Sequence, residues 1–570
     1  MLSISKAKFT QSWLSDLIFL TLVLGVFYSL WIGGHALFTP DEGRYSEVAR
    51  EMVVTGDYIT PRLNGVAFLD KPVLYYWLQA SAIKLFGLKE WALRFWPACI
   101  GILGCLMTYS AGRFLFNRRT GILSAVILAT SPLYYGAAHY ANLDLEVAAL
   151  ISITLFFSVL ALQTTSHRNR RLFFILAYVF CSLAALTKGL IGIVFPAMII
   201  GMWIMLLNRW SMLKHMRLIT GLIIFAAITI PWYFLVQQAN PEFLHFFFVT
   251  QQFSRFLTKG DFNNQTAVWF YIPIVIAGFF PWSIFAIQAV ANSIKNVWKN
   301  REQHSSQLFF VLWFFLIFIF FSIPKSKTVG YILPIFPALS LIVGNYLDGL
   351  WNKSRTKGFA IGVGVFILFS ISIAAIALAS PHIAAFKITR EQIPFLSFTA
   401  CTFLLAGASA YQFLRNKAFT DIIICLASTA VIGLLTLSAS TSVINDNTIK
   451  PVALQLKPKL VPSDEVVAYY KYYQDLPIYL ERRITIVADW KSPDIIKKDN
   501  WVRELWFGMP FQNTNDWLID ETAFWKRWNS DKRLFVLLNE SNYATFMAKA
   551  NNRVKQFGVY NDVVWVSNRS

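Results

Sequence analysis

Long apolar segments recur along the chain up to about residue 440, separated by short polar connections. A helix needs about 17–25 mostly apolar residues to cross a membrane. On this criterion the pattern predicts thirteen transmembrane helices, near residues 13–35, 92–112, 120–138, 144–164, 172–188, 189–207, 218–237, 268–292, 306–323, 329–350, 358–379, 394–413 and 419–440. The first segment is too long for a signal peptide and lacks a small-residue cleavage site, so we expect an uncleaved anchor.

The pattern changes after about residue 445. Strand-like runs at 466–470, 484–487, 534–538 and 559–566 alternate with helical stretches near 474–482, 519–528 and 540–550. We therefore expect two domains, a transmembrane domain over residues 1–445 and a small α/β domain over residues 446–570. The second shows no glycine-rich phosphate loop and no Cys/His metal spacing, which predicts a structural role or a role in gating substrate.

Composition supports a polytopic α-helical membrane protein. Of the 570 residues, 56% are hydrophobic and only 14% are charged, and the mean hydropathy is +0.50. The net charge of +20 would suit a nucleic-acid partner, but the Lys and Arg residues lie in short connections between apolar segments, so we expect none. The five cysteines fall within predicted spans, and we expect no disulfide framework.

The basic residues gather in alternate connections, which the positive-inside rule places in the cytoplasm. They are Lys6, Lys8, Arg113, Arg118, Arg119, Arg168, Arg170, Arg171, Arg209, Lys214, Arg217, Lys295, Lys299, Arg301, Lys353, Arg355, Lys357, Arg415 and Lys417. The N-terminus is then cytoplasmic. The C-terminal domain lies outside, together with loops 36–91, 238–267 and 324–328.

The stretch 39–72 is far too charged to lie in hydrocarbon, so we expect it at the outer membrane surface. Thr39 as N-cap, Pro40 at the first helical position and Glu42 three residues after the cap predict a capping box. Gly56 is the expected C′ residue of this helix. The helix is predicted to be amphipathic, with an apolar face formed by Ala49, Met52 and Val53.

Asp41, Arg44 and Tyr45 share another face of that helix by the i, i+3, i+4 rule. Asp70 and Lys71 place an acid beside a base at the end of the same loop. Both groups of charges are therefore expected close to the membrane surface.

Further polar residues stand at the outer ends of later spans. Asp144 begins a span, where a structural helix-end role and a catalytic role are about equally supported, and Glu146 fits a capping role better. Lys188 is a cation on the outer side, where the positive-inside rule predicts few cations. We therefore expect it to have an anionic partner.

Two later loops add cations. Loop 238–267 mixes aromatic residues with Arg255 and suits contact with a lipid phosphate. The segment containing Lys325, Lys327 and Tyr331 is predicted to be a flexible basic clamp that closes over a phosphate.

The chain has no Walker A sequence, no HExxH, no GxSxG and no candidate cysteine nucleophile, which excludes ATP-driven transport, zinc proteolysis and serine hydrolysis by known motifs. Cations at headgroup depth suit a lipid-linked phosphate whose charge rises as it becomes a leaving group. An acid beside them could orient or deprotonate an acceptor, or hold a divalent cation.

Five motifs together resemble the polyprenyl-phosphate-dependent GT-C glycosyltransferases, above all the bacterial lipid A aminoarabinose transferases, kin to the protein O-mannosyltransferases. They are Pro40-Asp-Glu-Gly-Arg-Tyr45 with Asp70-Lys-Pro72, Tyr140-Ala-Asn-Leu-Asp144, Thr187-Lys-Gly189, Arg255-Phe256, and Lys325-x-Lys327-x-x-x-Tyr331. The resemblance covers essentially the whole chain and implies a GT-C fold with juxtamembrane helices in the first outer loop. It also implies a site between the transmembrane bundle and the outer domain, and an undecaprenyl-phosphate sugar donor.

By position, the resemblance implies that Asp41 and Asp144 are the essential acids. The lipid phosphate would be surrounded by Lys71, Arg255 and Tyr331, with Arg44, Tyr45, Lys188, Lys325 and Lys327 as further binding residues. Relatives of this family can hold a metal with a Glu and a His. This chain has Asp70 and Gln252 there, so Asp70 is the candidate ligand for a divalent ion, although Gln is a poor zinc ligand.

The leading hypothesis is therefore a monomeric glycosyltransferase of the bacterial inner membrane that acts at the periplasmic face. It would transfer an aminoarabinose-like sugar from undecaprenyl phosphate to lipid A or another envelope glycan. The sequence leaves open which sugar and acceptor are used, including a protein or O-antigen hydroxyl. A lipid-linked-sugar flippase is the main alternative; it predicts paired charges at mid-membrane depth and internal repeats, which the sequence lacks. A scaffold for envelope assembly is a third reading.

Overall fold

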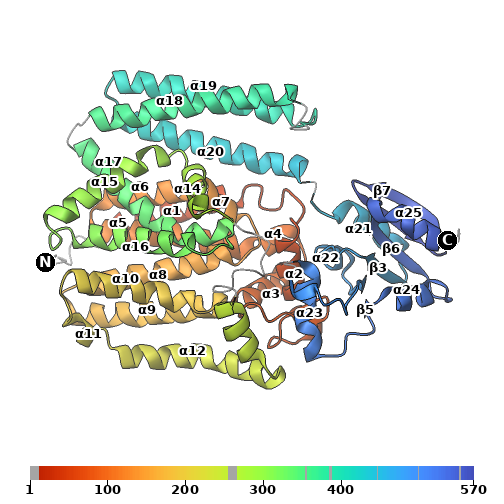
Figure 1. Cartoon of the computed structure of the whole chain (residues 1–570). Helices are drawn as coiled ribbons and strands as arrows, with labels where there is room; N and C mark the ends of the chain where they lie inside the picture. Colours follow the sequence, from red (N-terminus) through yellow and green to blue (C-terminus); the bar gives the residue numbers. More distant parts are fainter. Residues whose placement is uncertain are drawn as a thin grey trace. The chain divides into compact units, whose positions relative to one another are not determined.

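The computed structural model describes residues 12–254, 266–352, 356–383, 388–445, 447–497, 500–550 and 554–569. The chain divides into two compact units. Unit 1 combines residues 1–34, 94–231 and 266–444, and unit 2 combines residues 35–93, 232–265 and 445–570. Figure 1 shows their elements, coloured along the sequence.

Among its described residues, unit 1 contains helices and no β-strand. Its elements are α1 (Ser12–Ser29), α5 (Phe95–Leu115), α6 (Arg118–Ala129), α7 (Pro132–Ala138), α8 (Asp144–Gln163), α9 (His167–Lys188), α10 (Ile191–Leu206), α11 (Met212–His215), η3 (Val268–Phe270), α14 (Tyr271–Gly278), α15 (Ser283–Lys299), α16 (Ser305–Ser322), η4 (Val329–Ile335), α17 (Phe336–Asn352), α18 (Thr356–Ala379), η5 (Ser380–His382), α19 (Ile393–Arg415) and α20 (Phe419–Ile444). Helix α12 (Leu218–Ala239) begins in unit 1 and ends in unit 2.

The predicted polytopic helical architecture is confirmed. Among the described residues, nine helices are long and apolar enough to cross a membrane, and two bent pairs also pass the test, α6 with α7 (66°) and η3–α14 with α15 (114°). Together with the shorter apolar helices α1 and α10, these elements fall one to one on the predicted spans. The bends coincide with proline at positions 132 and 281, where a proline ring cannot continue a helix.

Helix α8 lies at the centre of unit 1. Of its most apolar window, 94% is buried, whereas α18, α19 and α20 bury about a third or less of theirs. The last three helices pack on one another in sequence order and expose apolar side chains such as Leu405 and Leu437. Exposed apolar residues on long helices suit contact with lipid tails.

Unit 2 joins the first long loop to the C-terminal part of the chain. The loop contributes α2 (Asp41–Thr55), β1 (Arg62–Leu63), β2 (Val66–Ala67), α3 (Leu74–Phe86) and α4 (Glu90–Leu93), and the π-helix η2 spans His245–Ser254. The C-terminal part contributes α21 (Lys450–Leu456), η7 (Lys457–Lys459), β3 (Glu465–Tyr469), α22 (Leu476–Leu480), β4 (Thr485–Val487), η8 (Ile495–Lys497), α23 (Trp501–Gly508), η9 (Met509–Phe511), β5 (Leu518–Ile519), α24 (Glu521–Trp528), β6 (Leu534–Asn539), α25 (Glu540–Lys549), β7 (Lys555–Tyr560) and β8 (Val563–Ser567).

The C-terminal strands form one six-stranded sheet in the order β5-β4-β3-β6-β8-β7. Strands β5, β4, β3 and β6 run parallel, and β8 and β7 are antiparallel. The core includes Val467, Val536 and Phe546, packed between the sheet and helices α24 and α25. The α/β fold predicted after residue 445 is therefore present, but the single strand predicted at 559–566 is wrong, because a turn at Asn561 divides this stretch into a hairpin.

Candidate functional site

The N-terminus of α2 carries the first cluster of candidate residues. Asp41 and Arg44 form an ion pair one helical turn apart, and the Arg44 guanidinium lies 4.9 Å from the centre of the Tyr45 ring. The predicted shared face of these three residues is thus confirmed. Arg44 forms a second ion pair with Glu504 of α23, a residue 460 positions away that the sequence did not single out.

The predicted capping box is wrong. Thr39 donates its hydroxyl to Asn447, and Pro40 occupies the cap position without a side-chain bond. Glu42 does accept a backbone N–H, but from Phe38, at 2.9 Å. Gly56 ends the helix in the left-handed conformation (φ 74°), as predicted, because glycine adopts this backbone without a Cβ clash.

Burial alone would lower the pKa of Arg44, but the Glu504 and Asp41 carboxylates outweigh it and hold that pKa above its usual value. The Asp70 carboxylate acts on Arg44 in the same direction, so three acids surround one guanidinium. Lys71 donates from Nζ to the carbonyl of Asp70 at 3.2 Å. In unit 2 the structure therefore brings together Asp41, Arg44, Tyr45 and Asp70, with Lys71 next to Asp70 in the chain.

Two buried donors at this cluster have no hydrogen-bond acceptor among the described residues, the Arg44 Nε and the Tyr76 hydroxyl. Burial raises the pKa of Tyr76, so its hydroxyl stays protonated and can donate. The rings of Tyr45, Tyr75 and Tyr76 contact one another in edge-on or tilted arrangements, with ring centres 5.9–6.2 Å apart. Orphaned buried donors are rare in native structures, and they mark this cluster as a place for an anionic or oxygen-rich ligand.

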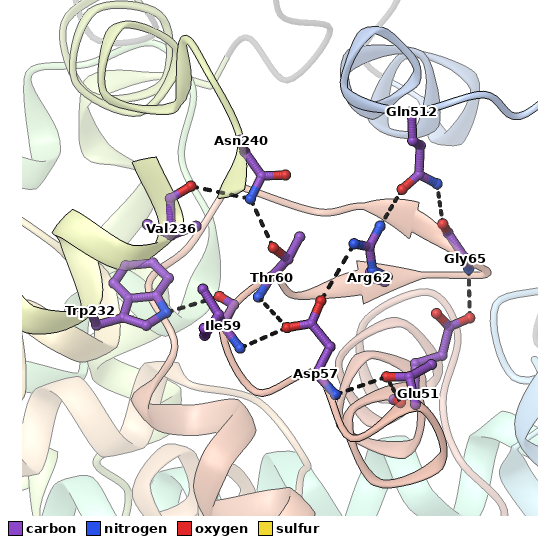
Figure 2. Close-up of polar contacts among 11 residues, drawn as sticks. Glu51, Asp57, Ile59, Thr60, Arg62, Gly65, Trp232, Val236, Asn240 and Gln512 are labelled. Atoms are coloured by element: carbon purple, nitrogen blue, oxygen red, sulfur yellow. Dashed lines mark hydrogen bonds and ion pairs between the residues drawn. The ribbon is translucent and has the colours of Figure 1, made fainter. Parts of the chain in front are cut away.

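The loop after α2 fastens this helix to its neighbours in unit 2 (Figure 2). Glu51 accepts the N–H of Gly65 in the β1–β2 turn at 2.5 Å, and Gln512, just after η9, bonds both Gly65 and Arg62. Gly65 needs its positive φ of 79°, and a Cβ there would meet the Arg483 side chain at 2.4 Å. Helix α2 is therefore held in a defined position.

The same loop also holds the C-terminal end of α12 (Figure 2). Trp232 donates to the carbonyl of Ile59 at 3.0 Å, and Asn240 donates to the Thr60 hydroxyl at 2.8 Å. Arg255, predicted to bind phosphate, lies beyond this point and outside the described residues, and nothing is described of the Gln252 side chain.

A metal at Asp70 does not fit the described residues. No group of three or more His, Cys, Asp and Glu side chains in the described part of the chain is arranged to hold a metal ion. The Asp41 and Glu504 carboxylates instead pair with Arg44, and the Asp70 carboxylate acts on the same guanidinium. We therefore derive no chemical step through a metal.

The second cluster lies in unit 1, where the first turn of α8 meets the last turn of α9. Asp144 begins α8 and forms an ion pair with Lys188, the last residue of α9; the two side chains are 16% and 11% exposed. The predicted anionic partner of Lys188 is thus Asp144. An acid at a helix N-terminus and a cation at a C-terminus are each stabilised by the helix dipole.

Tyr331 completes this cluster. The Lys188 ammonium lies 4.1 Å from the centre of the Tyr331 ring, a cation–π contact. Gly330 lies so close to Asp144 that a Cβ at this position would fall 2.1 Å from the carboxylate oxygen. In unit 1 the structure therefore brings together Asp144, Lys188 and Tyr331.

The capping role predicted for Glu146 is wrong. Its side chain is 2% exposed and accepts the hydroxyl of Thr187 at 2.9 Å. Glu146 and Asp144 thus bind consecutive residues at the end of α9, which fixes the register of the two helices.

The two lysines of the predicted clamp differ. Lys325 is exposed, whereas Lys327 is 4% exposed and donates to the backbone carbonyls of Thr266 (3.3 Å) and Ala267 (3.2 Å). Burial lowers the pKa of Lys327. Thr266 in turn donates to the carbonyl of Lys325. Segment 325–328, called the strap below, is therefore held by hydrogen bonds to residues 266 and 267.

The family profile described as dolichyl-phosphate-mannose-protein mannosyltransferase matches residues 70–234. The chain is similar to two proteins named undecaprenyl phosphate-alpha-4-amino-4-deoxy-L-arabinose arabinosyl transferase. The one from Pectobacterium atrosepticum is 27% identical over 90% of each chain, and the one from Pectobacterium carotovorum is 31% identical over 63% of this chain and 64% of that protein.

Among solved structures, the chain is similar to the crystal structure of ArnT from Cupriavidus metallidurans bound to undecaprenyl phosphate. The TM-score is 0.82 with 27% identity, covering 98% of each chain. The apo form of that ArnT gives a TM-score of 0.81. The apo oligosaccharyltransferase from Archaeoglobus fulgidus, at 12% identity and a TM-score of 0.54, shares the fold alone.

Proposed function

We propose that this chain, which belongs to the polyprenyl-phosphate-dependent GT-C glycosyltransferases, transfers an aminoarabinose-like sugar from an undecaprenyl-phosphate donor to lipid A or a related envelope glycan. The observation that carries the proposal is the whole-chain similarity to an ArnT whose crystal structure holds undecaprenyl phosphate. The two clusters of acids and cations supply the chemistry that such a transfer needs.

In the transfer, the bond between the anomeric carbon and the donor phosphate oxygen breaks, and both electrons stay on that oxygen. The acceptor oxygen forms the new bond to the anomeric carbon. Undecaprenyl phosphate leaves with one more negative charge than it had as a diester, so cations that face it stabilise the transition state. We propose this role for Lys71, Arg44 and Lys188, with Tyr331 beside Lys188.

Asp41 and Asp144 are the proposed essential acids. A lipid A phosphate is already ionised near neutral pH, so no proton has to be removed from it, and the acids would orient the acceptor and hold the cations in place. Asp144 holds Lys188 in this way, and Asp41 holds Arg44. A hydroxyl acceptor, as the name of the matching family profile suggests, would require one of the acids to accept a proton.

We place the reaction on the periplasmic face of the bacterial inner membrane. The distribution of Lys and Arg among the short connections supports this orientation, since cationic loops stay in the cytoplasm. The first long loop and the C-terminal residues, which contain Asp41 and Glu504, would then face the periplasm.

The test uses the purified full-length protein, an isotope-labelled undecaprenyl-phosphate-aminoarabinose donor and lipid A, with the product identified by mass spectrometry. We expect D41N and D144N each to lower kcat at least about 100-fold. D494N is the matched control, because Asp494 is exposed and its carboxylate pairs with the exposed Lys497, away from both clusters of proposed site residues. Full transfer by both variants, or movement of intact donor across vesicles without transfer, would refute the proposal.

A further inference from the structure

The C-terminal part of unit 2 contains a polar cavity that the proposed transfer does not use. Its volume is about 350 Å³, and it is lined by residues 462–466, 482–485 and 516–517 together with Arg527 and Lys532. It lies at the amino ends of the parallel strands β3 and β4, within one compact unit. Ligand pockets typically measure about 300–1,000 Å³, so this one suits a small ligand.

A buried carboxylate organises one wall of the cavity. Glu465, 7% exposed, accepts the Thr485 hydroxyl at 2.6 Å and Arg527 at 2.7 Å, and pairs with Lys532 at 2.7 Å. Two cations therefore share one carboxylate, and this wall keeps a net positive charge. Buried ions persist where further partners satisfy them.

The opposite wall offers donors with spare capacity. Arg482 uses one N–H, bonded to the carbonyl of Asp464 at 3.2 Å. Arg483 lies over Trp517, with its guanidinium carbon 4.4 Å from the ring centre, and its charge also acts on Glu51. A guanidinium has five N–H donors in a rigid fork that matches phosphate.

Charge and shape indicate the ligand class. The lining holds four cations (Arg482, Arg483, Arg527 and Lys532) against three acids (Asp464, Glu465 and Asp516). Such a lining favours an anion that also carries hydroxyl groups, because the acids and Thr485 can accept or donate hydrogen bonds to hydroxyls. A purely apolar ligand would leave these groups unpaired.

We propose that this cavity binds a phosphorylated saccharide, with Arg482 and Arg483 contacting the phosphate and Glu465, Thr485 and Asp516 facing the sugar hydroxyls. The identity of this ligand rests on the proposed function: the ligand is then the phosphorylated glycan of the acceptor. The cavity would then select acceptors, and its lining residues are distinct from those that pair with Asp41 and Asp144.

The test is a binding measurement on the full-length D41N variant in detergent. This variant is used so that no turnover interferes. Isothermal titration calorimetry compares glucosamine 1-phosphate with inorganic phosphate and with neutral glucosamine. We expect glucosamine 1-phosphate to bind at least about tenfold more tightly than phosphate, and glucosamine to bind much more weakly than either. R482Q/R483Q should raise the Kd for glucosamine 1-phosphate at least about tenfold.

The matched control is K491Q/K497Q, which removes two exposed cations from outside the cavity lining and should leave the Kd unchanged. Hydrogen exchange provides a second readout, since glucosamine 1-phosphate should protect residues 482–485 and 516–517 in the unsubstituted protein. Equal Kd values for R482Q/R483Q and the control, or protection confined to other segments, would overturn the site. Because no catalysis is measured, the outcome is separate from that of the transfer assay.

Discussion

The strap formed by residues 325–328 yields a sharp prediction, because its two lysines have different surroundings. Replacing Lys327 with Met keeps the length of the side chain but removes the bonds to the carbonyls of Thr266 and Ala267. Replacing Lys325 with Met removes an exposed charge and no described side-chain bond. We predict that K327M impairs transfer and that K325M changes it less than about threefold.

The size of the effect follows from the two lost bonds. A hydrogen bond from a charged donor contributes about 1.5–3 kcal/mol. Burial of the ammonium opposes this gain, which is why the pKa of Lys327 is lowered. Tyr331 follows Lys327 by four residues, so we expect the loss of these bonds to weaken the contact between Tyr331 and Lys188. A net loss of about 1–3 kcal/mol corresponds to about a 5- to 150-fold fall in kcat/KM.

The assay measures kcat and KM for the lipid donor with K327M, K325M and K327R, alongside the thermal unfolding midpoint. A positioning role for Lys327 predicts that K327R recovers most of the activity, because arginine can still donate to both carbonyls. Equal losses in K325M and K327M would refute the reasoning, since both lysines would then bind phosphate directly. Unchanged activity in K327M would also refute it.

Three further predictions concern single contacts. E504Q should weaken the interaction between residue 504 and Arg44 by about 1–2 kcal/mol and lower kcat/KM for the donor about 5- to 30-fold. E504D should be intermediate, and steady-state kinetics of the three proteins measures this. K188M should lower kcat at least tenfold, because it leaves Asp144 without its counter-ion, and an activity equal to that of K188R would contradict this. Burial raises the pKa of Asp475 from 3.8 to about 6, so the folded state binds the proton more tightly than the unfolded state. Stability is then lost as pH rises from about 4 to 6, by about 3 kcal/mol, and D475N should abolish this loss in hydrogen exchange of residues 448–480.

The sequence by itself determined the helical spans and the main candidate residues. Apolar runs of membrane length reflect a local requirement, since every backbone group in hydrocarbon must be bonded within its own helix. Charges at the ends of such runs, as at Asp144 and Lys188, are costly enough to signal function or pairing, and the structure pairs these two. The face shared by Asp41, Arg44 and Tyr45 follows from helical periodicity alone.

Only the tertiary structure decided which partners these residues have. Glu504 reaches Arg44 across 460 residues of sequence, and Glu42 bonds Phe38 where local rules predicted Thr39. The different surroundings of Lys327 and Lys325 depend on the position of the Thr266 backbone, whose carbonyl accepts a hydrogen bond from Lys327. Such contacts arise when distant segments pack and bury polar groups that must then find partners, and neither periodicity nor propensity contains that information.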